Sequence, residues 1–196
     1  MTISPRPFVR AQEWPEQGEW TYEDWLRLPD DGTRYEVING VLHMTPAPSI
    51  AHQDATGNLY FAMKGHADVQ DLGKVFIAPV DVRLPGHPVP FEPDILFIRK
   101  NRTEIIGEQE IEGVPDLVVE VLSPSNWYYD RKDKFEVYRG AGVQEYWIVD
   151  YRAKTIEVFV LDEGEYVLLN KWGVEDSAGS RVLEGFQVAV ADVFRR

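Results

Sequence analysis

The sequence contains no cysteine among its 196 residues. Disulfide bonds, zinc–thiolate sites, iron–sulfur clusters and thiol nucleophiles are therefore excluded. It also lacks any apolar run near the roughly 20 residues that a membrane-spanning helix needs. Residues 1–17 have no apolar stretch of the kind found in signal peptides. We therefore expect a cytoplasmic protein with no membrane partner.

Basic residues are scarce, with 20 Lys and Arg against 33 Asp and Glu and a net charge of −13. Non-specific binding to nucleic acids depends on neutralisation of phosphates by Lys and Arg, so this balance argues against it. A local basic surface or a dimer groove could still bind a nucleic acid. The sequence also lacks a Gly-rich phosphate loop of the Walker or Rossmann type and a Gly-x-Ser-x-Gly elbow, so those templates do not apply.

Hydrophobic residues make up 44% of the chain, which is enough for one compact core. We expect an irregular N-terminal arm over residues 1–19 and a single domain over 20–196. The elements expected from periodicity, caps and turn residues are a helix at 22–28 behind a capping box at Thr21, a hairpin at 33–45 with a type I′ turn at Asn39-Gly40, a helix at 49–70 capped by Ser49, strands at 75–84, 92–98 and 116–122, a helix at 125–139, strands at 145–150, 155–161 and 165–172, and one short strand with a turn after 173. This order predicts an α/β fold, with a mixed, mostly antiparallel sheet flanked by helices.

Two acidic residues stand in or beside apolar strands. Glu120 interrupts the apolar run 117–122, where a lone carboxylate costs several kcal/mol unless it is neutralised, paired or bound to a cation. Asp94 precedes a second apolar strand and follows Pro93, which restricts the local backbone. The alternatives are a structural ion pair or a solvent-facing edge position for Glu120, and a turn aspartate for Asp94. Two acids on neighbouring strands offer hard oxygen ligands suited to Mg²⁺ or Mn²⁺.

Lys134 is the third candidate. Asp130, Lys134 and Tyr138 recur at i, i+4 and i+8, so they share one face of the expected helix. That helix follows the Glu120 strand after a short linker, so this face can lie over the end of the strand. An ammonium group there could orient a water nucleophile and balance charge on a phosphoryl group. The alternative is a solvated lysine that pairs with Asp130.

Two further residues are weaker candidates. Glu36, on the expected hairpin, is either a metal ligand or an outward-facing strand residue, and periodicity slightly favours the second. His52, in the first turn of the helix at 49–70, could contact a phosphate or shuttle a proton, although an isolated histidine at a helix start is more often a surface residue. The remaining histidines, His43, His66 and His87, have no spacing that indicates a zinc site.

Together these residues resemble the Uma2 family, also called DUF820. The resemblance covers roughly residues 20–195 and rests on several separate motifs, namely Tyr35-Glu36 with Asn39-Gly40, His52, Pro93–Phe97, Pro115–Ser125, the triplet Asp130, Lys134 and Tyr138, and Gly142–Asp150. The family is assigned to the PD-(D/E)XK nuclease superfamily. The resemblance therefore implies a restriction-endonuclease-like core.

The resemblance also implies roles for individual residues. Asp94 corresponds to the acid of the PD element and Glu120 to the second acid, and the backbone carbonyl of Val121 is an additional metal ligand. The sequence departs from the superfamily pattern where Leu122 occupies the position expected for lysine. In this family the lysine is usually displaced onto the following helix, where Lys134 stands in this sequence.

Glu36 and His52 match positions that the family tends to keep acidic and histidine. The function implied is a Mg²⁺- or Mn²⁺-dependent DNA endonuclease that hydrolyses phosphodiester bonds, with homodimerisation expected by analogy. Two alternatives stay open. One is a catalytically inactive nuclease-fold protein that binds nucleic acid or serves in an assembly, which the displaced lysine and the acidic balance favour. The other is an acidic, metal-binding, β-rich protein with no role on nucleic acids.

Overall fold

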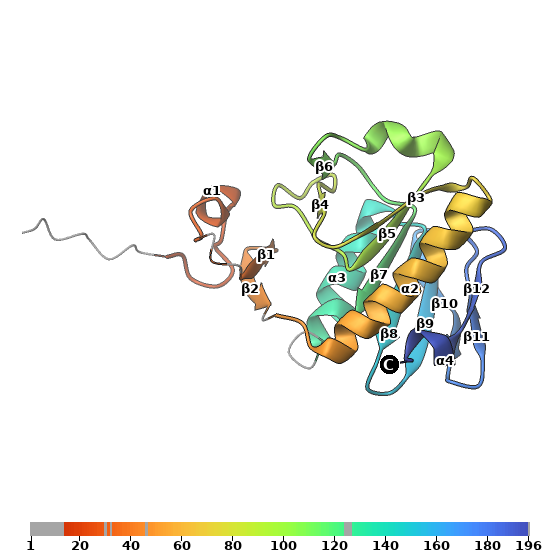
Figure 1. Cartoon of the computed structure of the whole chain (residues 1–196). Coiled ribbons are helices and arrows are strands. Elements are labelled where there is room, and N and C mark those ends of the chain that lie inside the picture. The colour runs from red at the N-terminus through yellow and green to blue at the C-terminus, as the bar shows by residue number, and fades with distance from the viewer. Residues whose placement is uncertain (1–13, 30, 32, 46, 124–126, 196) are drawn as a thin grey trace, which may run out of the picture.

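The structure is a computed structural model that describes residues 14–29, 31, 33–45, 47–123 and 127–195 (Figure 1). Most of the predicted N-terminal arm, residues 1–13, lies outside the described residues, and so do the first two residues of the helix predicted at 125–139. Within the described ranges, no helix combines the length and the apolar character needed to cross a bilayer.

A six-stranded mixed sheet forms the centre of the molecule, in the order β10-β9-β8-β7-β5-β3. Its strands are β3 (Gly73–Ile77), β5 (Ile95–Arg99), β7 (Leu117–Val121), β8 (Glu145–Asp150), β9 (Thr155–Asp162) and β10 (Glu165–Trp172). Neighbouring strands are antiparallel except β7 and β8, which run parallel. Helix α2 (Ile50–Val69) covers one face and helix α3 (Trp127–Ala141) covers the other (Figure 1). The predicted α/β fold with a mixed, mostly antiparallel sheet is confirmed.

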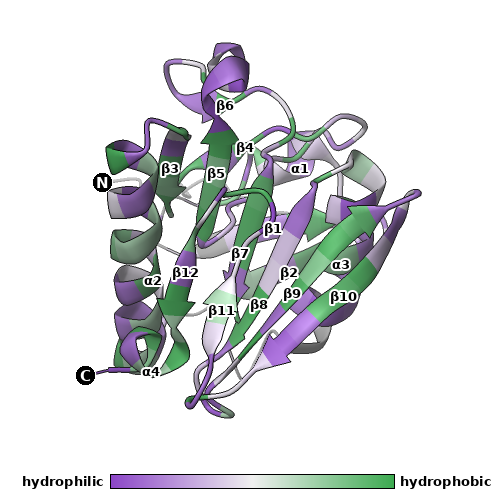
Figure 2. Cartoon of the chain, turned by 90° about the vertical axis from the view of Figure 1, so that its right-hand side faces the viewer, coloured by the Kyte–Doolittle hydropathy of each residue, from purple (hydrophilic) through white to green (hydrophobic). Residues whose placement is uncertain are grey.

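Side chains of the central strands alternate between the two faces of the sheet. Val119 and Trp147 pack in the cluster that includes the buried side chains of α2, whereas Val118 and Tyr146 pack in the cluster that includes α3. Strands β5, β7 and β8 are accordingly hydrophobic along most of their length (Figure 2), as is typical of strands covered on both faces. Glu120 has the same parity as Val118, so its side chain extends toward α3.

The N-terminal elements form a smaller unit beside this sheet (Figure 1). They are α1 (Tyr22–Trp25), β1 (Arg34–Ile38) and β2 (Val41–Thr45). The predicted capping box at Thr21 is confirmed. The predicted type I′ turn is confirmed too, because Asn39 and Gly40 have φ angles of 52° and 75°. A Cβ on Gly40 would lie 2.3 Å from the carbonyl oxygen of Gly18, so this close backbone approach also requires glycine.

The prediction of a single strand over residues 75–84 is wrong. β3 ends at Ile77, and β4 (Asp81–Val82) leaves the sheet to pair with β6 (Glu110–Ile111), a short strand that was not predicted. Pro79 lies between them and has no backbone N–H to continue the ladder, so the sheet pairing stops here. Ala78 still donates its N–H to the carbonyl oxygen of Asp94, at 3.0 Å.

The segment after 173 also differs from the prediction. It holds two short strands and a helical turn instead of one strand, namely β11 (Ser177–Gly179), β12 (Gln187–Ala189) and α4 (Val190–Val193). The 3₁₀ helix η1 (Lys100–Ile105) was not predicted. Helix α3 runs two residues past its predicted end and stops at Gly142, whose φ is +90°. The missed elements β11, β12, α4 and η1 are too short to show the periodicity by which sequence patterns identify helices and strands.

An ion-pair network connects α3 to the outer strands of the sheet. Glu157 on β9 accepts hydrogen bonds from both terminal nitrogens of Arg131, each at 2.8 Å, and its carboxylate lies 2.9 Å from Nζ of Lys171. The hydrogen bonds from Arg131, followed by those from Lys171, lower the pKa of Glu157, although partial burial opposes them.

We expect Glu157→Gln to lower the free energy of unfolding by about 1–2 kcal/mol at neutral pH. The pKa of Glu157 is lower in the folded state than its ordinary value of 4.5. The ionised side chain therefore stabilises the folded state fully above pH 4.5. The contribution is lost as pH falls through the lower folded pKa. Denaturant unfolding between about pH 5 and pH 3 should show a steeper loss of stability for the wild type than for the variant. The matched control is Glu175→Gln on an exposed loop, which should follow the wild type; equal effects of the two variants would contradict this account.

Candidate active site

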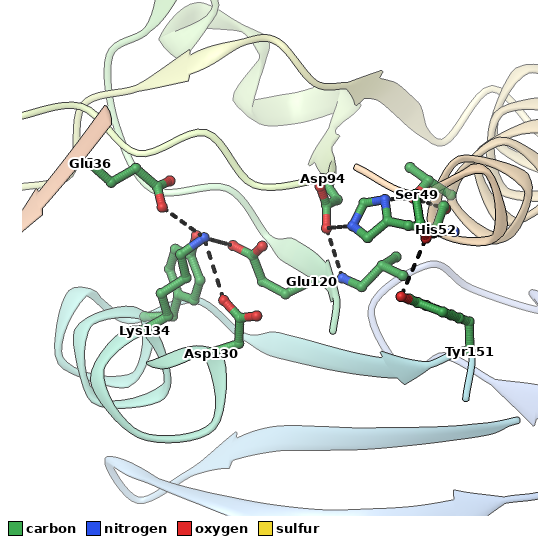
Figure 3. Close-up of polar contacts among 11 residues, drawn as sticks. Glu36, Ser49, His52, Asp94, Glu120, Asp130, Lys134 and Tyr151 are labelled. Atoms are coloured by element: carbon green, nitrogen blue, oxygen red, sulfur yellow. Dashed lines mark hydrogen bonds and ion pairs between the residues drawn. The ribbon is translucent and has the colours of Figure 1, made fainter. Parts of the chain in front are cut away.

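Lys134 lies in the interior, with only 3% of its side chain exposed. Its ammonium nitrogen is 2.9 Å from Oε1 of Glu120, 3.3 Å from Oε2 of Glu36 and 3.7 Å from Oδ1 of Asp130 (Figure 3). An ammonium group buried this deeply is strongly unfavourable unless carboxylates surround it. The structure therefore brings the displaced lysine to the carboxylate of Glu120, from the helix on which the sequence placed it.

Helix α3 contributes a second contact to the same carboxylate. The hydroxyl of Tyr138, one turn after Lys134, donates to Oε1 of Glu120 at 2.7 Å. Burial and the charge of Glu120 raise the pKa of Tyr138 well above its ordinary value, so the hydroxyl stays protonated and acts as a donor. The sequence placed Tyr138 on this helical face without assigning it a role. The spacing of four residues between Lys134 and Tyr138 was the sequence feature that could have indicated a shared contact.

Glu36 reaches the site from the hairpin and is only 2% exposed. Its Oε1 accepts from the backbone N–H of Glu92 and its Oε2 from the hydroxyl of Tyr129, each at 3.3 Å. The slight preference for an outward-facing Glu36 is therefore wrong. Both faces of the hairpin are covered, because Val37 packs in the cluster around Trp20 on the opposite side.

Asp94 and His52 form the other half of the site (Figure 3). Oδ2 of Asp94 accepts from the backbone N–H of Val121 at 2.8 Å and lies 3.3 Å from Nε2 of His52. Burial lowers the pKa of His52, but the hydrogen bond to Asp94, the charges of Asp94 and Glu120 and the backbone of Val121 together raise it. His52 is thus a buried member of the site and not a surface histidine.

Two hydroxyl groups extend this half toward the end of strand β8. Ser49 caps α2, as predicted, by accepting from the backbone N–H of His52 at 3.2 Å. Its hydroxyl also donates to the hydroxyl of Tyr151 at 3.3 Å. Tyr151 directly follows β8, which is parallel to β7, so the carboxyl termini of both strands lie at the same end of the sheet. Sequence patterns gave no signal for Tyr151, because this contact depends on the packing of α2.

The site contains more buried acidic than basic groups. Four acidic residues, Glu36, Asp94, Glu120 and Asp130, are each at most 6% exposed, and Lys134 and His52 oppose their charges. Burial raises the pKa of Asp130 well above its ordinary value, against the effect of Lys134, and the other three carboxylates raise it further. The excess of hard oxygen donors is the donor chemistry that suits Mg²⁺ or Mn²⁺.

The two predicted acid ligands contact different partners. Glu120 contacts Lys134, while Asp94 contacts His52 (Figure 3). Glu120 also accepts from Tyr138, and Asp94 accepts from the backbone N–H of Val121. Over the described residues, no set of three or more His, Asp or Glu side chains is arranged to hold a metal ion. Shared ligation by Asp94 and Glu120 thus requires a rotation of at least one of these side chains away from its present partner.

The profile of the Uma2 family, described as "Putative restriction endonuclease", matches residues 22–191. The chain belongs to the Uma2 family. Among solved structures, this Uma2 chain is similar to a "putative nuclease belonging to DUF820" from Anabaena variabilis ATCC 29413, with a TM-score of 0.71 and 18% identity over 88% of this chain and 96% of the other. The likeness confirms the restriction-endonuclease-like fold. No curated protein matches the Uma2 chain.

Removing the central cation should destabilise this Uma2 protein. We expect Lys134→Met to lower the free energy of unfolding by about 3–5 kcal/mol, because the buried carboxylates of Glu36 and Glu120 would lose the ammonium group that lies against them. Denaturant unfolding at neutral pH measures this difference. The matched control is Lys132→Met, an exposed lysine on the same helix, which should change stability by no more than about 0.5 kcal/mol.

A second substitution makes this test specific. Adding Glu36→Gln to Lys134→Met should recover part of the lost stability, because it removes one of the two buried negative charges that faced the ammonium group. If the two losses simply added, the ion pair between Lys134 and Glu36 would not contribute to stability.

Proposed function

We propose that this Uma2 protein is a divalent-metal-dependent nuclease that hydrolyses phosphodiester bonds in DNA. The contact of the buried Lys134 ammonium with Glu120, at the end of the strand beside Asp94, is the observation that carries the proposal. The description of the family supports the nuclease class. Mg²⁺ or Mn²⁺ as cofactor is supported by the excess of buried carboxylates.

A bound Mg²⁺ or Mn²⁺ would polarise the scissile phosphate and lower the pKa of a water molecule. Asp94, Glu120 and the carbonyl of Val121 would hold the ion. Lys134 would donate hydrogen bonds to the attacking water or to a phosphoryl oxygen, where it balances the developing negative charge. Tyr138 keeps the carboxylate of Glu120 oriented through its 2.7 Å hydrogen bond.

The remaining two site residues have supporting roles in this proposal. Glu36 holds the ammonium of Lys134 from the hairpin side. His52, which is hydrogen-bonded to Asp94, would give a proton to the leaving oxygen as its bond to phosphorus breaks. The attacking water would form the new bond to phosphorus and release its proton to the solvent, from which His52 is protonated again.

The nuclease proposal predicts that the protein nicks supercoiled plasmid DNA in the presence of Mg²⁺ or Mn²⁺. Asp94→Asn and Glu120→Gln keep the shape of each side chain and remove its charge. We expect each to slow nicking by at least about 100-fold, measured by gel quantification of the relaxed form over time. Asp192→Asn, an exposed carboxylate on α4, is the matched control and should nick at the wild-type rate.

The wild type and these variants also distinguish the nuclease function from the two alternative functions. Mn²⁺ should raise the melting temperature of the wild type and of Asp192→Asn, but not that of Asp94→Asn. Nicking by Glu120→Gln at the wild-type rate would reject this assignment of the site. A wild type that binds DNA and never nicks it would be a non-catalytic nucleic-acid-binding protein. A wild type that binds Mn²⁺ but no DNA at low salt would have no role on nucleic acids.

We also propose that the protein acts as a homodimer, because cleavage of both strands of a duplex is commonly carried out by two sites related by a two-fold axis. Light scattering at micromolar concentration should then give the mass of two chains. The mass of one chain across the whole concentration range used for nicking would rule the dimer out without affecting the assignment of the site.

A further inference from the structure

Most cations in the described part of this acidic protein lie close to a carboxylate. Ion pairs with nearby carboxylates neutralise many of the described cations, for example Arg83 with Glu110, Lys100 with Asp71 and Arg139 with Glu165. Arg152 and Lys154, like Lys74 and Arg181, form neither an ion pair nor a side-chain hydrogen bond with any residue in the described ranges. The side chains of Arg152 and Lys154 are exposed, and both belong to the short turn that joins β8 to β9.

The backbone of this turn is held in place. Oδ1 of Asp150 accepts from the backbone N–H groups of Arg152 and Ala153, each at 2.9 Å. Lys154 adopts a left-handed conformation with φ of 54°, and the flanking residues Asp150 and Thr155 are paired in the ladder between β8 and β9. The two cations therefore extend from a defined backbone, which reduces the entropy cost of binding an anionic partner.

The turn lies next to the candidate active site. Tyr151, its first residue, contacts Ser49 through the two hydroxyl groups at 3.3 Å, and its ring is 6.3 Å from the ring of His52. His52 in turn contacts Asp94. Strand register supports the same placement, because Val121 pairs with Val149, two residues before the turn. The turn and the beginning of α2 lie at the same end of the sheet (Figure 1).

Binding of DNA to this acidic protein requires cations close to the site. The chain carries a net charge of −13 and the site itself is rich in carboxylates, so the phosphate backbone of DNA needs a local group of cations in order to approach. Arg152 and Lys154 supply two such charges beside the site, and no carboxylate among the described residues neutralises them through an ion pair.

We propose that the β8–β9 turn is a DNA-binding element in which Arg152 and Lys154 contact backbone phosphates that flank the scissile phosphate. This inference rests on the proposed nuclease function and assigns the surface that binds its substrate. Phosphate contacts of this kind position the duplex and carry no base specificity.

The test is a binding measurement that does not depend on cleavage. A fluorescently labelled DNA duplex is titrated with the full-length protein in EDTA, and the dissociation constant is obtained from anisotropy at several salt concentrations. We expect Arg152→Ala/Lys154→Ala to weaken binding about tenfold or more. The slope of log affinity against log salt should become shallower by about 2, because two phosphate contacts are lost.

The matched control, Lys64→Ala/Lys74→Ala, removes the same charge elsewhere. Lys64 lies 12 residues along α2 from His52, about 18 Å away, and Lys74 pairs with Ile98 at the end of β5 remote from Asp94. This control should bind within about twofold of the wild type and keep its salt slope. Melting temperatures of both double variants should match the wild type, since all four side chains are at the surface.

The other outcomes distinguish failure of the turn from failure of the nuclease proposal. Equal weakening by both double variants would show that only net charge matters. Wild-type binding by Arg152→Ala/Lys154→Ala, with nicking intact in the unmodified protein, would reject the turn as the contact and leave the nuclease proposal standing. Loss of binding by this variant alone, in a protein that never nicks DNA, would support the turn and reject the hydrolytic function. No binding by the wild type even at low salt would overturn both.

Discussion

A buried ammonium group surrounded by carboxylates joins three separate parts of this structure. Lys134 extends from α3 to Glu120 on the central strand and to Glu36 on the N-terminal hairpin. Burial of any one of these charges alone would cost several kcal/mol. The cost is offset only when helix, strand and hairpin are all in place, so this cluster fixes their relative positions more specifically than apolar contacts do.

Burial against the apolar sheet strengthens the ion pairs and hydrogen bonds of this cluster. Val118, Tyr146 and Ile148 surround Glu120 on the face covered by α3, and each is at most 1% exposed. With water excluded, a hydrogen bond or an ion pair acts through a lower effective dielectric and is worth more than at the surface. The same exclusion raises the pKa of Asp130 and of Tyr138. Packing and charge therefore depend on each other in this protein.

Local patterns predicted most of the fold and part of the site. The apolar run with a single acid at Glu120 predicted its strand, and helical spacing placed Lys134 and Tyr138 on one face. In contrast, the contact between His52 and Asp94 depends on how α2 packs across the sheet, and no local pattern encodes it. The burial of Glu36 was missed for a related reason, since strand parity cannot reveal that both faces of a hairpin are covered.

The position of Glu36 has a consequence for the order in which the protein can assemble. Its hydroxyl partner, Tyr129, comes 93 residues later in the chain. During synthesis from the N-terminus, the hairpin exists long before α3, and its carboxylate must remain hydrated throughout that interval. Burial of this carboxylate beside its hydroxyl partner therefore waits for α3, although the hairpin itself is synthesised much earlier.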